Sequence, residues 1–402
     1  MDISLREIEL AGERLKSVLH HTELERSTTF SAMSGAEIYL KSENRQKTGS
    51  FKIRGASNKI ASLAEKGEVK SVVASSAGNH AQGVALAANK FGIPATIIMP
   101  KTAPIAKVQA TESYGAKVIL EGDCYDDAYA KACQVCESEG ATFIHPYNDL
   151  EVIAGQGTLG LEILKDLPTA DVVLVPAGGG GLLAGIAACI KQVNPRVQVI
   201  GVQGEGADAI CRSFKEKKLV TVDKVSTIAD GIAVKKPGDI SVEIINKYVD
   251  DMVTVTDLEI ADAILLLMER NKSIVEPAGA TSLAAALSGR LDIKGKRVVC
   301  ILSGGNIDVS FVRDIIEKGM LARHRTLKFV VTLLDMPGAL TEMLKTVTDC
   351  DANIVSIFHD RQILGPNQTD VHLTCEVGGQ EHGLTVIKGL RDRGYTVVVE
   401  HS

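Results

Sequence analysis

The sequence has little that a nucleic acid would recognise. It contains no basic run and no ladder of aromatic side chains, and aromatic residues make up only 4% of the chain. Its 44 lysines and arginines are outnumbered by 50 aspartates and glutamates, which leaves a formal net charge of −6. A groove that follows a phosphate backbone needs a positive surface. We therefore expect no nucleic-acid partner.

The sequence also lacks an apolar segment suited to export or to a membrane. The opening stretch, MDISLREIELAGERLK, carries charges throughout and has no apolar core of signal-peptide length. The longest uncharged run, residues 172–190, is about as long as a membrane span. Pro176 and the glycines at 178–181 would break a spanning helix there, so we interpret the run as strand, turn and helix. No membrane partner is expected.

Cysteine is too scattered for a disulfide framework. The eight cysteines are spread from Cys124 to Cys375, whereas disulfide-stapled domains pack such numbers into much shorter chains. Cys133 and Cys136 form a C-x-x-C pair, but no second pair completes a zinc site. These features favour a reducing, cytoplasmic location, and no metal site is predicted.

What the sequence does contain is an alternation of β-branched and helical runs. A chain of 402 residues with 45% hydrophobic content is expected to form two or three domains. The alternation predicts an α/β fold with open, parallel sheets covered by helices on both faces. Expected strands lie at 37–41, 69–74, 95–99, 116–120, 142–144, 171–175, 198–202, 252–254 and 297–302. Expected helices lie at 2–18, 80–91, 104–114, 125–139, 151–164, 182–193, 258–270 and 279–287.

These elements suggest two lobes with a cleft between them. We assign residues 1–50 and 151–320 to a large lobe and residues 51–150 to a small lobe. Residues 321–326, LARHRT, form a short basic linker. The runs over residues 327–402 then follow the order βαββαβ, which predicts a ferredoxin-like unit that is long enough to fold as its own domain.

Lys52 stands in a setting that can make a lysine reactive. It follows Phe51 and the turn Thr48-Gly49-Ser50, and a helical pattern begins directly after it. An ε-amine beside apolar groups and other cations, here Arg54 and Lys47, loses proton affinity and can attack an aldehyde. The alternative is that Lys52 is an ordinary solvated lysine, and only further motifs elsewhere in the chain could argue against that interpretation.

Four consecutive glycines mark a candidate phosphate site. Residues 176–182, PAGGGGL, join an expected strand to an expected helix. Glycine lets several backbone N–H groups converge, and the helix N-terminus adds partial positive charge, so a phosphate would be held there. The run from Gly179 to Ala184 also satisfies the dinucleotide fingerprint G-x-G-x-x-A, and Glu205 follows the next strand. A nicotinamide-dependent dehydrogenase is therefore an alternative.

Two further polar turns follow expected strands. Ser75-Ser-Ala-Gly-Asn-His80 exposes backbone donors that could take a substrate carboxylate, and the Asn79 amide could bond a phenolate-like oxygen. Ser303-Gly-Gly-Asn306 follows the strand at 297–302. Ligands bind open α/β sheets at the carboxyl ends of the strands, so these turns, the glycine run and Lys52 should converge in the cleft. A phosphate cradle, a Schiff-base lysine and polar donors are the groups that pyridoxal phosphate needs.

Five strings in the chain are long and position-specific: KSENRQKTGSFKIRGASNK, SSAGNHAQGVA, VIAGQGTLGLEI, PAGGGGLLAGIA and ILSGGNID. Through them, residues from about 24 to 319 resemble the fold-type II pyridoxal-phosphate enzymes, and closely the threonine/serine dehydratase (threonine ammonia-lyase) branch. The resemblance implies pyridoxal 5′-phosphate as cofactor in the large lobe. It also implies deamination of L-threonine to 2-oxobutanoate and ammonia, and of L-serine to pyruvate. Dehydration of another β-hydroxy amino acid, such as 3-hydroxyaspartate, and serine racemisation remain alternatives.

The resemblance implies a role for each candidate residue. Lys52 would form the Schiff base with the cofactor and act as the catalytic base, and Phe51 would pack near the ring. Asn79 would bond the ring oxygen, and Ser303 would meet the pyridine nitrogen. The phosphate would be held by a run of five residues, Gly178, Gly179, Gly180, Gly181 and Leu182. The substrate carboxylate would be received by the helix start formed by Ser75, Ser76, Ala77, Gly78, Asn79 and His80.

Two departures narrow the branch. Serine racemases, which the chain also resembles, place a second serine base where this sequence has Ala77, so racemisation by two bases is disfavoured. Their acidic metal ligands also have no counterpart in register here, because the turn after the strand at 198–202 begins Gln203-Gly204 and Glu205 and Asp208 are displaced. Glu276 and Gly231 match family loops near the cofactor, but no role is assigned to them.

The unit at 327–402 resembles a single ACT domain, with the turn Asp335-Met-Pro-Gly338 at the position where such domains bind small ligands. This resemblance implies an amino-acid effector, allosteric control and a homo-oligomer, either dimer or tetramer. It leaves open whether the enzyme serves isoleucine biosynthesis or a catabolic route. A non-catalytic amino-acid sensor is a further alternative, although it leaves the surroundings of Lys52 unexplained.

Overall fold

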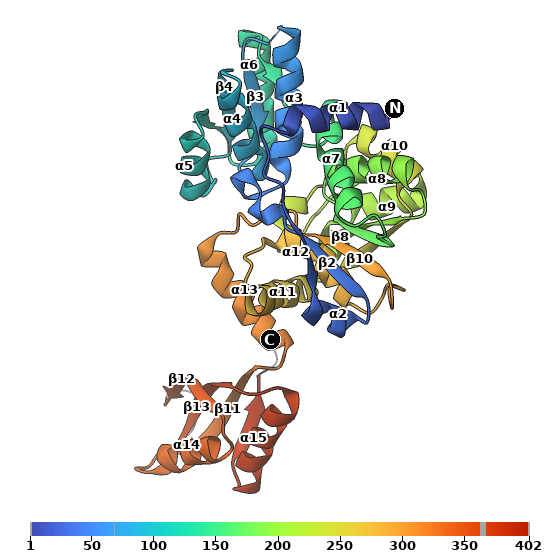
Figure 1. Cartoon of the computed structure of the whole chain (residues 1–402). Coiled ribbons are helices and arrows are strands. Elements are labelled where there is room, and N and C mark those ends of the chain that lie inside the picture. Colours follow the sequence, from blue (N-terminus) through green and yellow to red (C-terminus); the bar gives the residue numbers. More distant parts are fainter. Residues whose placement is uncertain (1, 68, 362–366, 401–402) are drawn as a thin grey trace. The chain divides into compact units, whose positions relative to one another are not determined.

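The structure is a computed structural model that describes residues 2–67, 69–361 and 367–400. The chain folds into two compact units, residues 1–308 and 309–402 (Figure 1). Lobe and linker boundaries at residues 50, 150, 320 and 326 stay predictions, and the outermost predicted positions, 1 and 402, lie outside the described residues.

The larger sheet of the first unit is parallel apart from one edge strand. Its strand order is β1-β2-β10-β7-β8-β9, and only β1 runs antiparallel to its neighbour β2. The strands are β1 (Leu24–Ser27), β2 (Glu37–Lys41), β7 (Val172–Pro176), β8 (Gln198–Gly204), β9 (Asp251–Val255) and β10 (Arg297–Ile301). Every residue of β7 is buried, as expected for a central strand with both faces covered.

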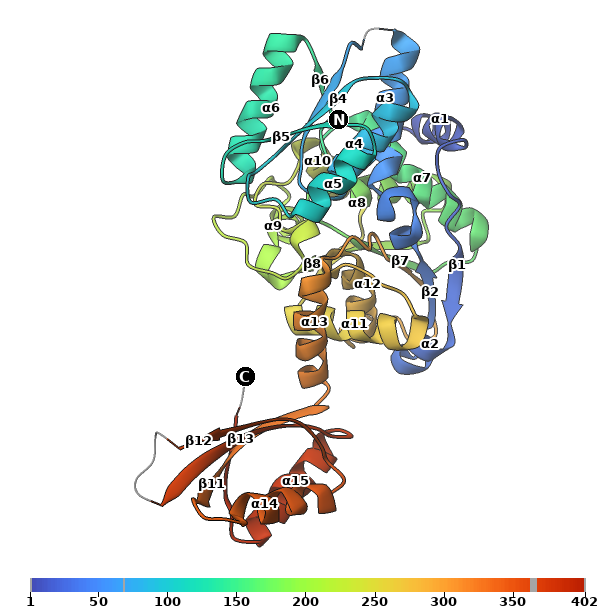
Figure 2. The ribbon, with the colours of Figure 1, turned by 90° about the vertical axis from the view of Figure 1, so that its left-hand side faces the viewer.

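Helices cover both faces of this sheet (Figure 2). One set packs around α8 and includes α1 (Leu5–Leu15), α7 (Leu150–Asp166), α8 (Gly181–Val193), α9 (Ala209–Glu216) and α10 (Asp239–Tyr248). The other set packs around α12 and includes α2 (Thr28–Ser34), α11 (Asp257–Leu266) and α12 (Pro277–Leu287). The apolar side chains of α8 and β7 form the centre of the main core.

A second, all-parallel sheet lies in the same unit, with strand order β5-β4-β3-β6. Its strands are β3 (Val72–Ser75), β4 (Ala95–Met99), β5 (Lys117–Leu120) and β6 (Thr142–Phe143). Its helices are α3 (Lys52–Lys66), α4 (Asn79–Lys90), α5 (Ile105–Ser113) and α6 (Tyr125–Glu139). Alanines and aliphatic side chains of α3, α4 and β3 form a separate core. Two covered sheets with their own cores confirm the two-sheet α/β class predicted for this part of the chain.

Several elements differ from the sequence-based expectation. The edge strand β1, the helix α2 and the helix α10 were not predicted, because each is short or lies between stronger patterns. The helix expected at 258–270 ends at Leu266 and continues as a π-turn, η5 (Leu267–Asn271). Lys272 follows with a positive φ of 59°, which a regular helix cannot accommodate.

The second unit begins with α13 (Val309–Ala322), which was not predicted, and contains an antiparallel sheet of order β12-β13-β11-β14. Its strands are β11 (Thr326–Leu334), β12 (Asn353–Asp360), β13 (Gln368–Glu376) and β14 (Thr396–Val399). The helices α14 (Ala339–Asp349) and α15 (Gln380–Asp392) share one core with the sheet. The chain order from β11 to β14 is βαββαβ, so the predicted ferredoxin-like topology is confirmed.

All eight cysteines are free thiols. Within the described ranges, no helix combines the length and the apolar character that crossing a membrane requires.

Candidate active site

One cavity of about 590 Å³ in the first unit brings together every residue predicted for the site. Its walls include the predicted cofactor residues Phe51, Lys52, Asn79, Gly178, Gly179, Gly180, Gly181, Leu182 and Ser303. They also include the predicted substrate residues Ser75, Ser76, Ala77, Gly78 and His80. Turns from both parallel sheets therefore meet at one place, as the positions of these turns after the strands suggested.

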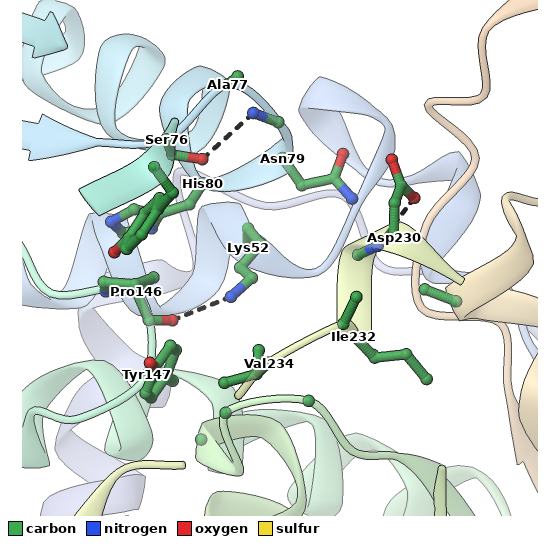
Figure 3. Close-up of a pocket in the computed structure, with 18 of the residues that line it drawn as sticks. Lys52, Ser76, Ala77, Asn79, His80, Pro146, Tyr147, Asp230, Ile232 and Val234 are labelled. Atoms are coloured by element: carbon green, nitrogen blue, oxygen red, sulfur yellow. Dashed lines mark hydrogen bonds between the residues drawn. The ribbon is translucent and has the colours of Figure 1, made fainter. Parts of the chain in front are cut away.

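Lys52 is the first residue of α3, and its position follows from a tight turn before it. Thr48 and Gly49 have positive φ values of 63° and 70°, and Ser50 pairs with Gly304 across a single β-bridge. This turn points the Lys52 side chain into the cavity, where its Nζ donates a hydrogen bond of 2.9 Å to a main-chain carbonyl (Figure 3).

The surroundings of Lys52 reduce the proton affinity of its amine. Removal from bulk water lowers the pKa of Lys52 to about 8, and the charge of Glu276 opposes part of this shift. His80 and His145 both lose proton affinity through burial and through the charge of Lys52, which lowers the pKa of His80 to about 3 and that of His145 to about 4. Both histidines are therefore neutral near pH 7. Of these three basic groups, only the amine of Lys52 titrates close to that pH.

The glycine run forms the turn from β7 into α8. Gly180 has a φ of 99°, which glycine adopts without strain, and Gly181 opens the helix. A Cβ atom at Gly179 would lie 2.3 Å from ring carbons of Tyr147. The main chain thus passes directly under that ring, and the helix N-terminus faces the cavity with its N–H groups.

The turn from β3 into α4 forms the opposite wall. Ser76 accepts a hydrogen bond of 3.2 Å from the Gly78 N–H through its Oγ. His80 is buried, and its Nε2 donates to the carbonyl oxygen of Ile144 at 2.8 Å, because a carbonyl oxygen can only accept. Ser75 is fully buried and its Oγ has no hydrogen-bond partner, although the residue lines the cavity. This orphan hydroxyl indicates that a polar ligand group completes the wall.

Ser303 lies at the start of the loop after β10. It is almost fully buried, and its carbonyl oxygen accepts a hydrogen bond of 3.1 Å from the N–H of Phe51. Asn79 lies nearby at the start of α4 and donates from Nδ2 to both carboxylate oxygens of Glu276, at 2.8 and 3.0 Å. No role was assigned to Glu276 from the sequence, yet it is buried within the same wall.

Sequence reasoning missed the segment His145–Asn148, which links β6 to α7. Pro146 supplies the carbonyl oxygen that accepts from Lys52, and Tyr147 stands against the glycine turn (Figure 3). His145 shapes the segment by accepting from the N–H of Asn148 at 2.9 Å through Nδ1. The segment contains no glycine and no motif, so only its place after a strand could have indicated a function.

A second group lines the cavity near η4 (Asp230–Ile232), the loop of Gly231, to which no role was assigned from the sequence. The carboxylate of Asp230 in η4 lies 3.7 Å from the ammonium of Lys107 on α5. Opposite charges therefore face each other from a helix of the second sheet and from the η4 turn. Both residues line the cavity, as do the aliphatic side chains Ile232 and Val234 (Figure 3). Within the described part of the chain, no three His, Cys, Asp or Glu side chains are arranged to hold a metal ion.

Comparison with known proteins gives consistent matches. A model of the family described as "Pyridoxal-phosphate dependent enzyme" matches residues 16–304. The L-threonine ammonia-lyase of Thermotoga maritima is 50% identical over 397 residues, which cover 98% of this chain and 99% of that protein. These two matches agree with the resemblance found in the sequence, and the nicotinamide alternative finds no support in them.

Solved structures agree on the fold. Maize serine racemase is similar with a TM-score of 0.75 and 37% identity, covering 81% of this chain and 100% of its own. The processed form of threonine deaminase isoform 2 from Solanum lycopersicum is similar with a TM-score of 0.75 and 36% identity, covering 78% of this chain and 93% of its own. The chain therefore belongs to the family of pyridoxal-phosphate dependent enzymes.

Proposed function

We propose that the chain is a pyridoxal-phosphate dependent lyase that converts L-threonine to 2-oxobutanoate and ammonia, and L-serine to pyruvate and ammonia. The observation that carries the proposal is a buried amine of lowered pKa, Lys52, in one cavity with a four-glycine helix start. The full-length similarity to an L-threonine ammonia-lyase supports the choice of substrate.

The residues present fit the cofactor. The turn at 178–181 brings main-chain N–H groups to the start of α8, where a phosphate is favoured. A Cβ at Gly178 would lie 2.9 Å from the Cα of Ile232, so any larger residue would clash with the main chain there. The unpartnered Oγ of Ser75 and the amine of Lys52, whose pKa is lowered to about 8, supply the polar groups that such a ligand needs.

We assign the cofactor contacts as follows. Gly178 to Leu182 would hold the phosphate, Ser303 would meet the pyridine nitrogen, and Lys52 would hold the aldehyde end of the cofactor through Nζ. Asn79 donates to the ring oxygen, and Phe51, whose ring centroid lies 5.3 Å from the Lys52 Nζ, packs beside the cofactor ring. When bound, pyridoxal phosphate supplies an electron sink that stabilises the negative charge left when Cα loses its proton.

The chain's own groups position the substrate and move the proton. The N-terminus of α4, Ser75 to His80, receives the substrate carboxylate through main-chain donors. Lys52 would accept the Cα proton at Nζ, because an amine with a pKa of about 8 is about half neutral near that pH. The β-hydroxyl leaves with one proton as water, which balances the proton removed from Cα. One water is then added as ammonia is released, so threonine yields 2-oxobutanoate and ammonia with no oxidant or reductant.

The experiment that tests this function combines colour and turnover. Protein purified with pyridoxal phosphate is expected to show the visible absorbance of the bound cofactor and to release ammonia from L-threonine. Lys52→Ala loses both, whereas Lys66→Ala, at the solvent-exposed end of the same helix, keeps both. A wild-type protein that holds the cofactor but releases no ammonia from threonine or serine would sink the proposal, and release from 3-hydroxyaspartate alone would favour that alternative.

Serine racemisation is the second candidate, because a serine racemase is among the similar structures. Ala77 offers no proton-transfer group on the cavity wall opposite Lys52. We therefore expect L-serine to give pyruvate without D-serine. Ala77→Ser would place a hydroxyl there, and chiral chromatography should then detect D-serine; D-serine from the unaltered protein would instead favour the racemase.

We further propose that the second unit is an ACT-like effector domain spanning residues 327–402 after a linker at 321–326. The turn Asp335-Met-Pro-Gly338 joins β11 to α14, and Gly338 has a φ of 96°, so the turn presents main-chain groups at its tip. The amino-acid effector, the control of activity, a cytoplasmic homo-oligomer and the division of residues 1–320 into large and small lobes belong to the same proposal. Turnover measured with and without isoleucine, valine and serine tests the effector, and light scattering tests the oligomer. The proposal would be contradicted if none of these amino acids changed the activity and if the particle mass stayed the same at every protein concentration.

A further inference from the structure

The Asn79 amide is bonded on both of its polar atoms inside the cavity wall. Its Nδ2 donates to the two carboxylate oxygens of Glu276, at 2.8 and 3.0 Å. Its Oδ1 accepts from Nδ2 of Asn306 at 2.7 Å, and the same Nδ2 donates to the carbonyl oxygen of Thr48 at 2.6 Å. A continuous row of hydrogen bonds thus runs from the turn before Lys52 to the buried carboxylate of Glu276.

The order of donors and acceptors in this row permits one orientation of the Asn79 amide. A main-chain carbonyl such as that of Thr48 only accepts, so Asn306 must present its NH2 group to it. The same NH2 group then meets the Oδ1 of Asn79, which leaves the Asn79 NH2 group for the carboxylate. Turning the Asn79 amide by 180° would set oxygen against carboxylate and NH2 against NH2, with buried groups left unpaired on both sides.

The packing leaves the row little freedom to shift. A Cβ at Gly304 would lie 2.4 Å from Oε1 of Glu276 and 3.1 Å from Nδ2 of Asn79. A Cβ at Gly49 would lie 2.4 Å from Oδ1 of Asn306. The main chain is tied at the same points, because the N–H of Glu276 donates to the Gly304 carbonyl at 3.0 Å. Glycines at 49 and 304 are therefore required for the side chains of this row to come together.

We propose that Asn306 and Glu276 are positioning residues that hold Asn79 with its NH2 group, and not its carbonyl oxygen, available to the ring oxygen of pyridoxal phosphate. The inference deepens the proposed function and rests on it. Asn306 is not among the residues that line the cavity, so its effect on a bound cofactor passes through Asn79. A donor at this place stabilises the deprotonated ring oxygen, whereas a carbonyl oxygen would repel it.

The test reverses the direction of the hydrogen bond between residue 306 and Asn79 with a side chain of nearly the same volume. Asn306→Asp replaces the donor toward Asn79 by an acceptor, so the Asn79 amide is expected to turn and present its oxygen. The dissociation constant of pyridoxal phosphate, measured by fluorescence titration, should rise about 10- to 100-fold, the range for losing one strong buried hydrogen bond. The pKa of the cofactor's ring oxygen, followed by absorbance, should rise as well. Asn89→Asp is the matched control, since Asn89 also donates from Nδ2 to a carbonyl, that of Tyr114 at 2.9 Å, at the far end of α4.

A double variant separates positioning from simple loss of structure. Asn306→Asp should also lower the melting temperature, because the turned Asn79 oxygen faces the carboxylate of Glu276. When Asn306→Asp is combined with Glu276→Gln, the amide NH2 group at position 276 can donate to that oxygen, so part of the melting temperature should be recovered. Cofactor affinity and the ring-oxygen pKa should not recover, because Asn79 still presents its oxygen. Unchanged affinity and absorbance in Asn306→Asp, or recovery of both in the double variant, would overturn the inference. A wild-type protein that binds no pyridoxal phosphate would instead overturn the proposed function.

Discussion

The Nζ of Lys52 donates a hydrogen bond of 2.9 Å to the carbonyl oxygen of Pro146, a residue 94 positions away. The carbonyl belongs to the segment that links β6 to α7, and the next residue, Tyr147, packs against Gly179. One short segment therefore contacts both the reactive amine and the phosphate turn. The contact holds the free amine inside the cavity, where it remains desolvated and its pKa is lowered to about 8.

This lowered pKa predicts a pH dependence of stability in the cofactor-free protein. Between pH 8 and about 10.5 the unfolded chain keeps a proton on Lys52 that the folded chain has lost, so the free energy of unfolding should rise with pH across this window. The slope is at most on the order of 1 kcal/mol per pH unit. Urea unfolding of wild type and Lys52→Met at pH 7.5 to 10 measures it. The variant should lose the rise, and parallel curves for both proteins would contradict the prediction.

Gly179→Ala should damage the phosphate turn more than an ordinary glycine substitution would. The added methyl group would lie 2.3 to 2.5 Å from three ring carbons of Tyr147, so the ring or the turn must shift. We expect the dissociation constant of pyridoxal phosphate to rise at least about tenfold, since one misplaced main-chain donor costs about one strong hydrogen bond.

The control for this variant is Gly12→Ala in α1. Its added Cβ meets only Leu161, at an ordinary 3.7 Å, and alanine favours a helix. Cofactor affinity should therefore stay unchanged and the melting temperature should hold or rise. The double variant Gly179→Ala with Tyr147→Ala removes the clash. If it binds the cofactor no better than Gly179→Ala alone, contact with the ring is not the cause of the loss.

Much of the site could be predicted because its signals are local. The glycines at 178–181 and the polar run from Ser75 to His80 follow apolar strands, and parallel strands end at one edge. The segment from His145 to Asn148 carried no comparable signal, because its contacts with Lys52 and Gly179 arise only when two sheets come together.

The same limit applied to elements and charges that depend on distant partners. The edge strand β1 is half-exposed and is a strand only because it pairs with β2. The alternation of apolar and polar residues over its four positions is too short to reveal this pairing. The burial of Arg54 could not be predicted either, because its acidic partner Glu162 lies 108 residues away on α7. Charged residues are almost never buried unless they are paired, and pairing over such a distance has no sequence signature.

That buried arginine leads to a stability prediction. Arg54, two residues after Lys52, donates to both carboxylate oxygens of Glu43, at 2.7 and 2.8 Å, and to those of Glu162, at 2.6 and 3.0 Å. Both acids hold the pKa of Arg54 above its usual value, despite the opposing effect of burial. Arg54→Met leaves the buried carboxylate of Glu43 without its cation, which typically costs about 3 to 5 kcal/mol, whereas the partly exposed Glu162 keeps Lys41 at 2.9 Å.

Urea unfolding of the Arg54→Met protein measures this cost, with Arg14→Met as the control. Arg14 pairs with Glu65 at 2.9 Å near the surface, where an ion pair is worth roughly 0 to 1 kcal/mol. Removing the Glu43 charge as well, in Arg54→Met with Glu43→Gln, should recover part of the loss because the buried Glu43 carboxylate no longer lacks a cation and Glu162 still pairs with Lys41. An Arg54→Met protein as stable as Arg14→Met would show that the buried cluster does not anchor the start of α3.

Glu276 predicts a second pH dependence, opposite in sign to that of Lys52. Burial raises the pKa of Glu276 to about 7, against the lowering effects of the Asn79 hydrogen bond and the charges of Lys107 and Lys52, and the charge of Asp230 raises it further. Between pH 4.5 and 7 the folded chain therefore binds a proton that the unfolded chain has lost, so the free energy of unfolding should fall as the pH rises through this window. In the cofactor-free protein, Glu276→Gln should abolish this fall, which is on the order of 1 kcal/mol per pH unit, whereas Glu13→Gln on the exposed face of α1 should retain it. Urea unfolding at pH 5, 6 and 7 decides the matter, since equal slopes for wild type and Glu276→Gln would mean that Glu276 is ionised across the whole range.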